Sequence, residues 1–366
     1  MIASARTARF LTAFLRGGKG AISEREMTLD VGGEAREATL YLPDHPRRVP
    51  GWVVLHGLTV PGRKHVALTR FVRSLAASGA VVLVPDIPAW RELRLDVEAA
   101  RATLEAATVR LADHPRVQPG GVGAIGFSFG ATQALMAAAD PRLHSVLRAV
   151  VGFGGYCDLG RMVRALFTGE HDWSGESHRM DPDPYGRWVV AGNFLTLVPG
   201  YEGMERVRRG AMELGIEAGR RGAFAWEAGY DAMKAEIRAT LSEDELPVWD
   251  ILAAPARAPV HDLAASRELA DRFTAAALRV APGLDPLPRL PELRGRIVLS
   301  HGRTDRLIPF TETLRLAATL PRSADVSTTI TGLFAHSGGA GGLQAMARAR
   351  ESLTFIQLMN QALGAL

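Results

Sequence analysis

The sequence predicts an α/β protein, in which a mostly parallel central sheet is flanked by helices and interrupted by a large helical insertion. Short apolar runs rich in β-branched residues are typical of strands that are buried on both faces of a sheet. Such runs occupy residues 51–57, 80–86, 122–128, 146–155 and 296–302. Amphipathic stretches at 65–78 and 95–112 lie between them. This alternation of strand and helix predicts parallel strands covered by helices.

The alternation stops after residue 156 and resumes near residue 291. Residues 157–290 hold no convincing buried strand, but contain Trp-, Glu- and Arg-rich stretches at helical spacing. We therefore predict an α/β core in 21–156 and 291–366, with a helical cap or lid inserted at 157–290. The remaining elements of the core are expected as two strands within 22–42, a helix near 311–320, a strand near 325–331 and a helix near 342–363.

Residues 1–20 are basic, lack acidic side chains and place Phe10, Leu11, Phe14 and Leu15 on one helical face. The apolar block is too short for the hydrophobic region of a secretory signal. A short helix packed on the core is the favoured interpretation, and an anchor on a membrane surface is the alternative.

Composition limits the partners that the sequence suggests. With 47% hydrophobic and 22% charged residues, the chain has ample material for a core. The net charge of +4 comes without a Lys/Arg-rich run, so no nucleic acid partner is expected. No apolar run approaches the roughly 18 residues that span a bilayer. The one cysteine, Cys157, allows no intramolecular disulfide and favours a reducing, cytoplasmic location. No zinc motif is present, and the spacing of His171 and His178 matches no known site, so neither a metal nor another cofactor is expected.

The stretch from Gly120 to Ala138 contains two overlapping glycine patterns. Gly121, Gly123 and Gly126 spell G-x-G-x-x-G, the pattern of a dinucleotide-binding turn. That turn requires a strand before its first glycine, whereas a turn-forming segment precedes Gly121 and the apolar residues after it are the predicted strand. The dinucleotide interpretation is therefore disfavoured.

Gly126, Ser128 and Gly130 spell G-x-S-x-G, and this pattern has the local context that its chemistry needs. A predicted strand ends at Phe127, and a helix-forming segment follows Ser128 directly. A nucleophilic serine stands on such a sharp strand-to-helix turn, where flanking glycines avoid Cβ clashes. A chain with 38 glycines can contain such a pattern by chance. The assignment of Ser128 as a nucleophile therefore depends on whether the chain also offers a base and an acid as its partners.

A serine nucleophile needs a base and a carboxylate that orients the base. Asp305 lies in the loop after the predicted strand 296–302. His336 is the only histidine that follows Asp305 in the chain, and it also comes after a predicted strand. Asp158 is the alternative acid, whereas Asp325 opens the last strand instead of following it.

Taken together, the motifs VVLHGL, VLVPD, GAIGFSFGA, IVLSHGRTDRLIP and FAHSGG make the chain resemble the α/β-hydrolase fold superfamily, over residues 51–156 and 292–366. The resemblance implies Ser128 as nucleophile, His336 as base and Asp305 as orienting acid. It also implies an oxyanion hole built from the backbone N–H of Phe129 and an N–H of the segment HGLTVPG. Leu58 is the candidate in that segment, with Thr59 as the alternative. His56 and Asp86 are expected to shape loops.

The expected activity is hydrolysis of a carboxylic ester or thioester of a small molecule, through an acyl-enzyme on Ser128. Amidases, lactonases and acyltransferases use the same groups and stay open, as do a non-catalytic binding protein and a membrane-associated lipid-handling protein. The aromatic residues of the insertion either bind the acyl chain in a lid or form the insertion's own core. They are Trp173, Tyr185, Trp188, Phe194, Tyr201, Phe224, Trp226 and Tyr230.

Overall fold

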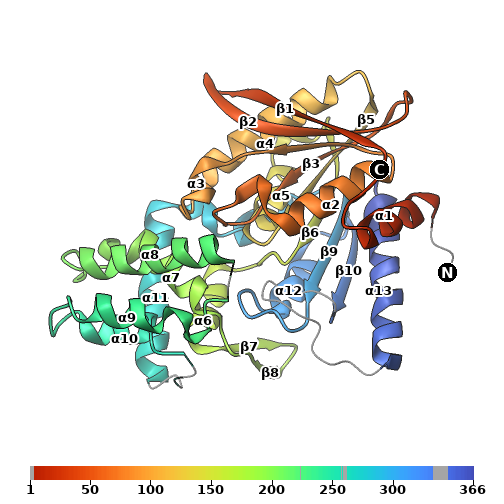
Figure 1. The fold of residues 1–366 in the computed structure, drawn as a ribbon. Helices are drawn as coiled ribbons and strands as arrows, with labels where there is room; N and C mark the ends of the chain where they lie inside the picture. Colours follow the sequence, from red (N-terminus) through yellow and green to blue (C-terminus); the bar gives the residue numbers. More distant parts are fainter. Residues whose placement is uncertain (1–3, 223, 257, 259–261, 333–344) are drawn as a thin grey trace.

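A twisted sheet forms the centre of the molecule (Figure 1). The computed structural model describes residues 4–222, 224–256, 258, 262–332 and 345–366, and within these eight strands form one sheet in the order β1-β2-β4-β3-β5-β6-β9-β10. The strands are β1 (Ile22–Val31), β2 (Glu34–Pro43), β3 (Val49–Leu55), β4 (Val81–Pro85), β5 (Val117–Phe127), β6 (Leu147–Phe153), β9 (Arg296–Gly302) and β10 (Asp325–Thr331). The predicted strands are therefore present, with ends shifted by a few residues.

The sheet is parallel from β4 to β10 and antiparallel at one edge. Strands β1 and β2 form a hairpin, and β2 pairs with β4 in the antiparallel direction. Gly32 and Gly33 form the hairpin turn with φ of 63° and 88°, a conformation that glycine adopts without a Cβ penalty. The carboxyl ends of β5, β6 and β9 lie in register, because Phe127 is opposite Phe153 and Phe153 is opposite Ser300.

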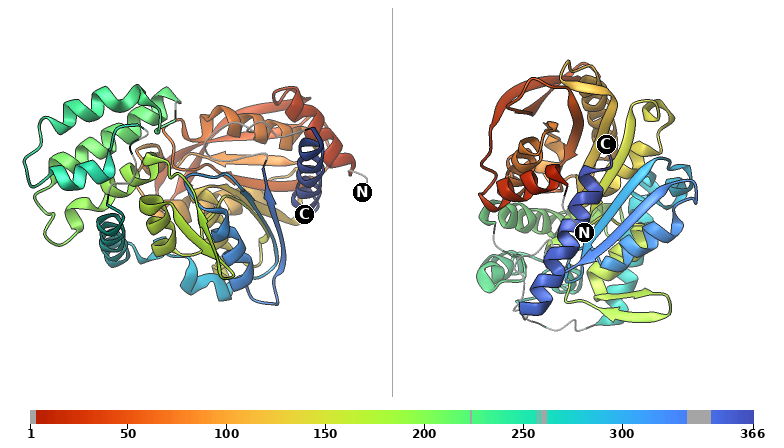
Figure 2. Two further views of the ribbon diagram at one scale, coloured as in Figure 1. Left: turned by 90° about the horizontal axis from the view of Figure 1, so that it is seen from below. Right: turned by 90° about the vertical axis from the view of Figure 1, so that its right-hand side faces the viewer.

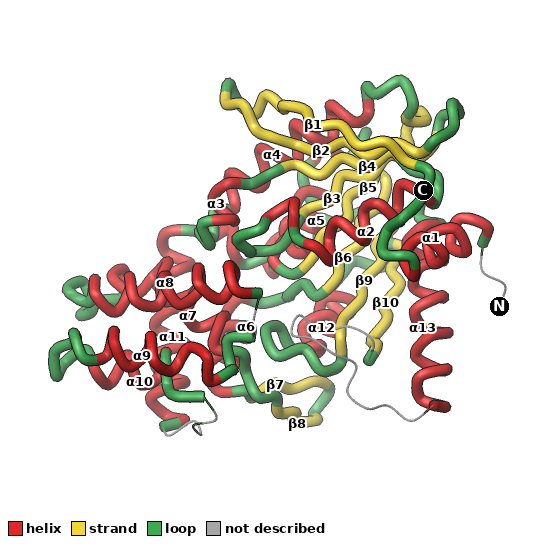
Figure 3. The backbone as a smooth tube through the Cα atoms, viewed as in Figure 1, coloured by secondary structure: helices red, strands yellow, loops and turns green. Residues whose placement is uncertain are grey.

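Helices cover both faces of the sheet, as the tube in Figure 3 shows. Alternate residues of β3 point to opposite faces, so that Trp52 and Val54 belong to one buried cluster and Val53 and Leu55 to the other. Helices α1, α2 and α13 pack into the first cluster, and α4, α5 and α12 into the second. These helices are α1 (Ala5–Leu15), α2 (Val66–Ala77), α4 (Val97–Ala112), α5 (Phe129–Ala138), α12 (Phe310–Thr319) and α13 (Ala345–Leu363), and the short α3 (Pro88–Arg91) follows β4.

The segment between β6 and β9 forms a mainly helical region beside the sheet (Figure 2, left). It contains α6 (Leu159–Thr168), β7 (Glu170–Trp173), β8 (Glu176–Arg179), α7 (Pro184–Phe194), α8 (Glu205–Arg221), α9 (Asp231–Arg238), α10 (Leu246–Leu252) and α11 (Leu263–Val280). The hairpin of β7 and β8 was not predicted. Apart from Trp173 its residues are polar, and all are partly or fully exposed, so the sequence there carries no apolar strand pattern.

Residues near the amino end form the helix α1, which packs on the core. The ring of Phe10 lies 5.3 Å from that of Phe71 on α2, and the ring of Phe14 lies 6.3 Å from that of Phe355 on α13. Phe10 is fully buried. Within the basic segment, Ala5–Leu15 therefore form a helix whose Phe10 and Phe14 pack against α2 and α13.

Candidate active site

Ser128 stands at the turn between β5 and α5 in a strained conformation. Its φ of 56° and ψ of −127° lie in a region that non-glycine residues rarely adopt. A Cβ on Gly126 would overlap the main-chain oxygen of Gly130, and a Cβ on Gly130 would overlap that of His56. Both glycines are therefore required for this close approach of strand and helix. Gly121, Gly123 and Gly126 lie inside β5, which leaves no glycine turn of the dinucleotide-binding kind.

The backbone around Ser128 is held by the neighbouring strand. Ser128 N–H donates a 2.7 Å hydrogen bond to the oxygen of Phe153, the last residue of β6, while Ala131 N–H donates to the Ser128 oxygen. Phe129 is the first residue of α5, and the first N–H groups of a helix have no partner within it. Its ring is buried, with its centroid 5.0 Å from that of Trp90. The turn thus fixes a partly exposed serine beside the amino end of a helix.

The loop between β3 and α2 (residues 56–65, the β3–α2 loop) lies directly against Ser128. A Cβ on Gly57 would stand 3.2 Å from Ser128 Cβ and 3.7 Å from Ser128 Oγ. Below the loop, Ile87 N–H donates to Nε2 of His56, so the His56 proton is on Nδ1 and is donated to the Gly57 oxygen at 2.7 Å. Burial lowers the pKa of His56, which agrees with a neutral ring. His56 therefore shapes the loop, as the sequence suggested.

The mainly helical segment between β6 and β9, called the inserted segment from here on, also contacts this loop. The hydroxyl of Tyr185 on α7 donates a 2.9 Å hydrogen bond to the Leu58 oxygen, and Val60 packs against Gly219 on α8. Arg91 Nε donates to the Val60 oxygen at 3.2 Å and also pairs with Asp86 at 3.1 Å. Asp86 thus takes part in fixing this turn of the chain.

Asp305 is almost fully buried, at 5% exposure, in the loop between β9 and α12 (residues 303–309, the β9–α12 loop). Its Oδ1 accepts hydrogen bonds from Leu307 N–H at 2.8 Å and Ile308 N–H at 3.0 Å. Its Oδ2 lies 3.5 Å from Nε2 of His301, which donates to the Ile308 oxygen at 2.8 Å. Oδ1 of Asp305 therefore fixes the turn of the loop, and this turn sets the position of Oδ2.

His301 is a buried residue beside Asp305 that the sequence analysis did not single out. It is fully buried, and its Nδ1 accepts a 2.7 Å hydrogen bond from Thr313 while Nε2 holds the turn around Asp305. His301 stands before a glycine at the end of β9, as His56 does after β3. The His-Gly pair that recurs at two strand ends is the sequence signal that could have identified His301.

The structure brings Ser128 and Asp305 to one edge of the sheet. Gly154 N–H, just after β6, donates to the Ser300 oxygen of β9, so the ends of β5, β6 and β9 are joined by consecutive hydrogen bonds. Arg303 N–H donates to the Thr331 oxygen at the end of β10. His336 lies outside the described residues, which end before it at Gly332. The N–H of Gly332 donates to the Glu351 carboxylate on α13 at 2.8 Å.

The alternative acids and Cys157 have other surroundings. Asp158 caps α6 by accepting a 2.9 Å hydrogen bond from Arg161 N–H. Asp325 begins β10, at the opposite edge from Asp305, and pairs with Arg296 at 2.6 Å. Cys157 is buried, and burial together with Glu312 raises the pKa of its thiol to about 12, which disfavours the reactive thiolate.

The inserted segment also contacts the β9–α12 loop. The guanidinium of Arg306 lies 4.0 Å from the centre of the Trp226 ring, and its Nε donates to the Asp181 oxygen at 2.7 Å. Asp183 N–H donates to the Arg306 oxygen. Among the predicted aromatic residues, Trp188, Phe194 and Tyr230 are buried, in the same cluster as one face of the central sheet. The segment therefore borders the loops on both sides of Ser128.

Two further properties of the described residues bear on the kind of site. No group of three or more His, Cys, Asp or Glu side chains within them is arranged to hold a metal ion. None of the helices in the described ranges is both long and apolar enough to cross a membrane.

Comparison with known proteins identifies the fold. No family model matches the sequence, and no curated protein matches it. The structure is similar to acylaminoacyl peptidase from Pyrococcus horikoshii, with a TM-score of 0.51 and 10% identity over 96% of this chain and 43% of the peptidase. It is also similar to brefeldin A esterase, a bacterial homologue of human hormone-sensitive lipase, with a TM-score of 0.50 and 15% identity over 100% of this chain and 86% of the esterase.

These likenesses, together with the sheet, establish that the chain has the α/β-hydrolase fold. The chain spans less than half the length of the peptidase that it matches. By their names, one of these two proteins is a peptidase and the other is an esterase.

Proposed function

We propose that the protein is a serine hydrolase that cleaves carboxylic esters or thioesters of small molecules. The observation that carries the proposal is the strained Ser128 at the turn between β5 and α5, with Gly57 of the β3–α2 loop against it. A strained backbone of this kind persists where the surrounding structure enforces it. A sharp strand-to-helix turn places the nucleophilic oxygen clear of the sheet.

In the proposed reaction, Ser128 Oγ attacks the acyl carbon while the imidazole of His336 accepts the hydroxyl proton. The tetrahedral intermediate collapses as the imidazolium returns this proton to the leaving alcohol or thiol, which leaves an acyl-enzyme. Water then attacks the acyl carbon with His336 again as base, and the acid is released. Asp305 orients the imidazole and stabilises its positive charge.

The assignment of His336 is supported by chain order and by reach. Four residues of extended chain span at most about 14 Å, and His336 is four residues beyond Gly332. Gly332 follows β10, the strand that pairs with β9, and Asp305 is in the loop after β9. The order of serine, acid and histidine along the chain is the one that this fold uses.

Phe129 and Leu58 are the proposed donors of the oxyanion hole. The C=O and N–H of a trans peptide point in opposite directions. Because the Gly57 oxygen accepts from the buried His56, the Leu58 N–H points away from that ring. The Leu58 oxygen accepts from Tyr185, so the Thr59 N–H points away from the inserted segment. This arrangement supports Leu58 over Thr59.

We also propose that residues 157–290 act as a lid that shapes the acyl-binding site. The support is the pair of contacts that the segment makes, to the β3–α2 loop through Tyr185 and to the β9–α12 loop through Trp226. An amidase would use the same groups, and the substrate panel below separates it from an esterase or thioesterase.

The proposal is tested with a fluorophosphonate probe and a panel of p-nitrophenyl esters, thioesters and anilides. The wild type is expected to be labelled at Ser128 and to hydrolyse esters or thioesters. Ser128→Ala is expected to lose labelling and to lower kcat by a factor on the order of 10⁶ if the triad acts as a unit. Full activity of Ser128→Ala, or a folded wild type that is not labelled, contradicts the mechanism.

A further inference from the structure

A hollow lined by positively charged side chains lies at the end of the sheet where the parallel strands begin, whereas Ser128 lies at the end where they finish. Its volume is about 530 Å³, which is within the range of small-molecule sites. Val49 and Pro50 at the start of β3 line it, and Gly79 just before β4 completes one side. The seven residues of β3, at about 3.3 Å each, separate its two ends by roughly 20 Å. The hollow is therefore distinct from the candidate active site.

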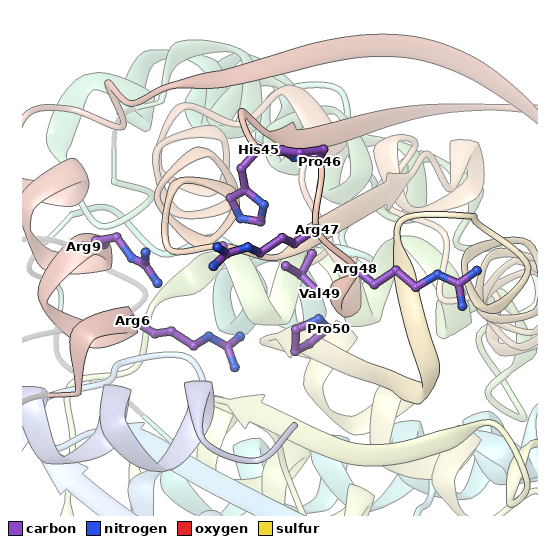
Figure 4. A pocket seen from close by; sticks show the side chains of 9 residues that line it. Arg6, Arg9, His45, Pro46, Arg47, Arg48, Val49 and Pro50 are labelled. Atoms are coloured by element: carbon purple, nitrogen blue, oxygen red, sulfur yellow. The ribbon is translucent and has the colours of Figure 1, made fainter.

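Cations from two separate elements meet in this hollow. Arg6 and Arg9 come from α1, and His45, Arg47 and Arg48 come from the loop between β2 and β3. Figure 4 shows Arg6, Arg9, Arg47 and His45 turned toward a common space, whereas Arg48 points away from it. No acidic residue is among the lining residues.

The spacing of two of these side chains can be given directly. Nη2 of Arg9 and Nε2 of His45 each lie 3.7 Å from the point at which Gly79 would carry a Cβ. Gly79 has a φ of 100°, a backbone conformation that glycine adopts without a Cβ penalty. Two nitrogen donors from different elements thus approach one small region of space.

Several cationic donors of the hollow have no acceptor in the part of the chain that the structure describes. Nε and Nη2 of Arg6 are buried with no hydrogen-bond partner there, and only Nη1 donates, to the main-chain oxygen of Leu366 at 3.1 Å. Arg9 and Arg47 form no ion pair with any described residue. Burial, together with the nearby Arg9 charge, lowers the pKa of Arg6. Because buried donors without acceptors are costly, a bound anion would stabilise this arrangement.

The elements that carry the cations are themselves held in place. Nη2 of Arg116 donates to the main-chain oxygens of Pro43, at 2.7 Å, and His45. Phe10, the neighbour of Arg9 on α1, is buried in the core and so anchors this helix on the sheet. The cluster is therefore built from fixed backbone segments and does not depend on one flexible loop.

We propose that the hollow binds the phosphate group of a phosphorylated small molecule or of a lipid headgroup, through Arg6, Arg9 and Arg47 with His45. A guanidinium presents paired N–H donors that match phosphate oxygens. A terminal phosphate offers three acceptor oxygens and up to two negative charges, so it can engage three arginines at once. A carboxylate has two oxygens and one charge, and is a poorer match to the same donors.

The test is calorimetric titration of the full chain with inorganic pyrophosphate. Arg9→Gln/Arg47→Gln removes two exposed cations that face the hollow. The control Arg48→Gln/Arg322→Gln removes two other exposed cations: Arg48 points away from the hollow, and Arg322 is not among the residues that line it. The first pair is expected to weaken binding at least about tenfold, the second less than about twofold, because only the first removes charged hydrogen bonds to the ligand. Both variants should keep the ester hydrolysis of the wild type, which confirms that they fold.

Two sources of the phosphate are separated by a second arm, sedimentation with phosphatidylcholine vesicles with and without phosphatidic acid. Binding to the acidic vesicles that is lost in Arg9→Gln/Arg47→Gln indicates a headgroup, whereas pyrophosphate binding alone indicates a soluble ligand. The proposal is overturned if the wild type binds neither probe or if the two double variants lose affinity equally. It is also overturned if citrate binds as tightly as pyrophosphate.

Discussion

The hydroxyl of Tyr185 donates a 2.9 Å hydrogen bond to the main-chain oxygen of Leu58 and so joins α7 of the inserted segment to the β3–α2 loop. On the other side of the same loop, His56 donates to the Gly57 oxygen at 2.7 Å. Two consecutive peptide groups are therefore held by side chains from different parts of the chain. One of these groups carries the Leu58 N–H proposed for the oxyanion hole.

Removing the Tyr185 hydroxyl is expected to weaken catalysis more than folding. A hydrogen bond of this kind contributes about 1 kcal/mol, and Tyr185→Phe should lower kcat about fivefold with KM little changed. Tyr201→Phe is the matched control, because its hydroxyl accepts from Arg272 at 2.8 Å within the same segment but does not touch the loop. Steady-state kinetics on a p-nitrophenyl ester check this, and equal kcat values for the two variants would count against a positioning role.

The carboxylate of Asp305 is expected to matter through its charge. Asp305→Asn keeps an oxygen for the turn at Leu307 and Ile308 but removes the negative charge that orients and stabilises the imidazolium. By analogy with serine triads, kcat should fall by a factor on the order of 10⁴. Asp158→Asn and Asp325→Asn are the controls, and each should retain most of the wild-type kcat. If Asp158→Asn shows the large loss instead, the acid has been assigned to the wrong residue.

The parts of this site that sequence could predict are those set by local pattern. Ser128 and Phe129 follow from a strand, two glycines and a helix within a short stretch, and the strand ends follow from apolar runs. The contact between Tyr185 and Leu58 joins residues 127 positions apart, and the cluster of Arg6, Arg9 and Arg47 joins α1 to a distant loop. Single-sequence patterns contain no information on such tertiary packing.

The glycine before the serine gives a prediction on stability. A Cβ on Gly126 would overlap backbone atoms of Gly130 and Ala131, which no side-chain movement can relieve. Gly126→Ala is therefore expected to cost about 3 kcal/mol or more of unfolding free energy, or to prevent folding. Gly203→Ala is the control, because nothing lies within 4 Å of the added Cβ and the backbone has no positive φ. Urea denaturation of both variants measures the difference, and similar midpoints would contradict the close approach of β5 and α5.

His171 gives a prediction on pH. Burial and the stacked ring of His178, 5.3 Å away, lower the pKa of His171 to about 4 from the 6.5 of an unfolded chain. As pH falls from about 6.5 to about 4, the unfolded chain takes up a proton here that the folded chain does not. The unfolding free energy should therefore decrease over this window, and below about 4 this residue should add no further loss.

His171→Gln should make the loss of stability between pH 6.5 and 4 shallower than in the wild type, since it deletes one of the groups responsible for the slope. The amide can still hydrogen bond to Thr311, which lies 3.1 Å from Nδ1 of His171, so the folded structure should be preserved. Gly203→Ala changes no titrating group and adds a Cβ with nothing within 4 Å, so it is the control and should leave the slope unchanged. Urea midpoints measured across this pH range separate the cases. Parallel slopes for His171→Gln and the wild type would mean that burial of this ring does not depress its pKa.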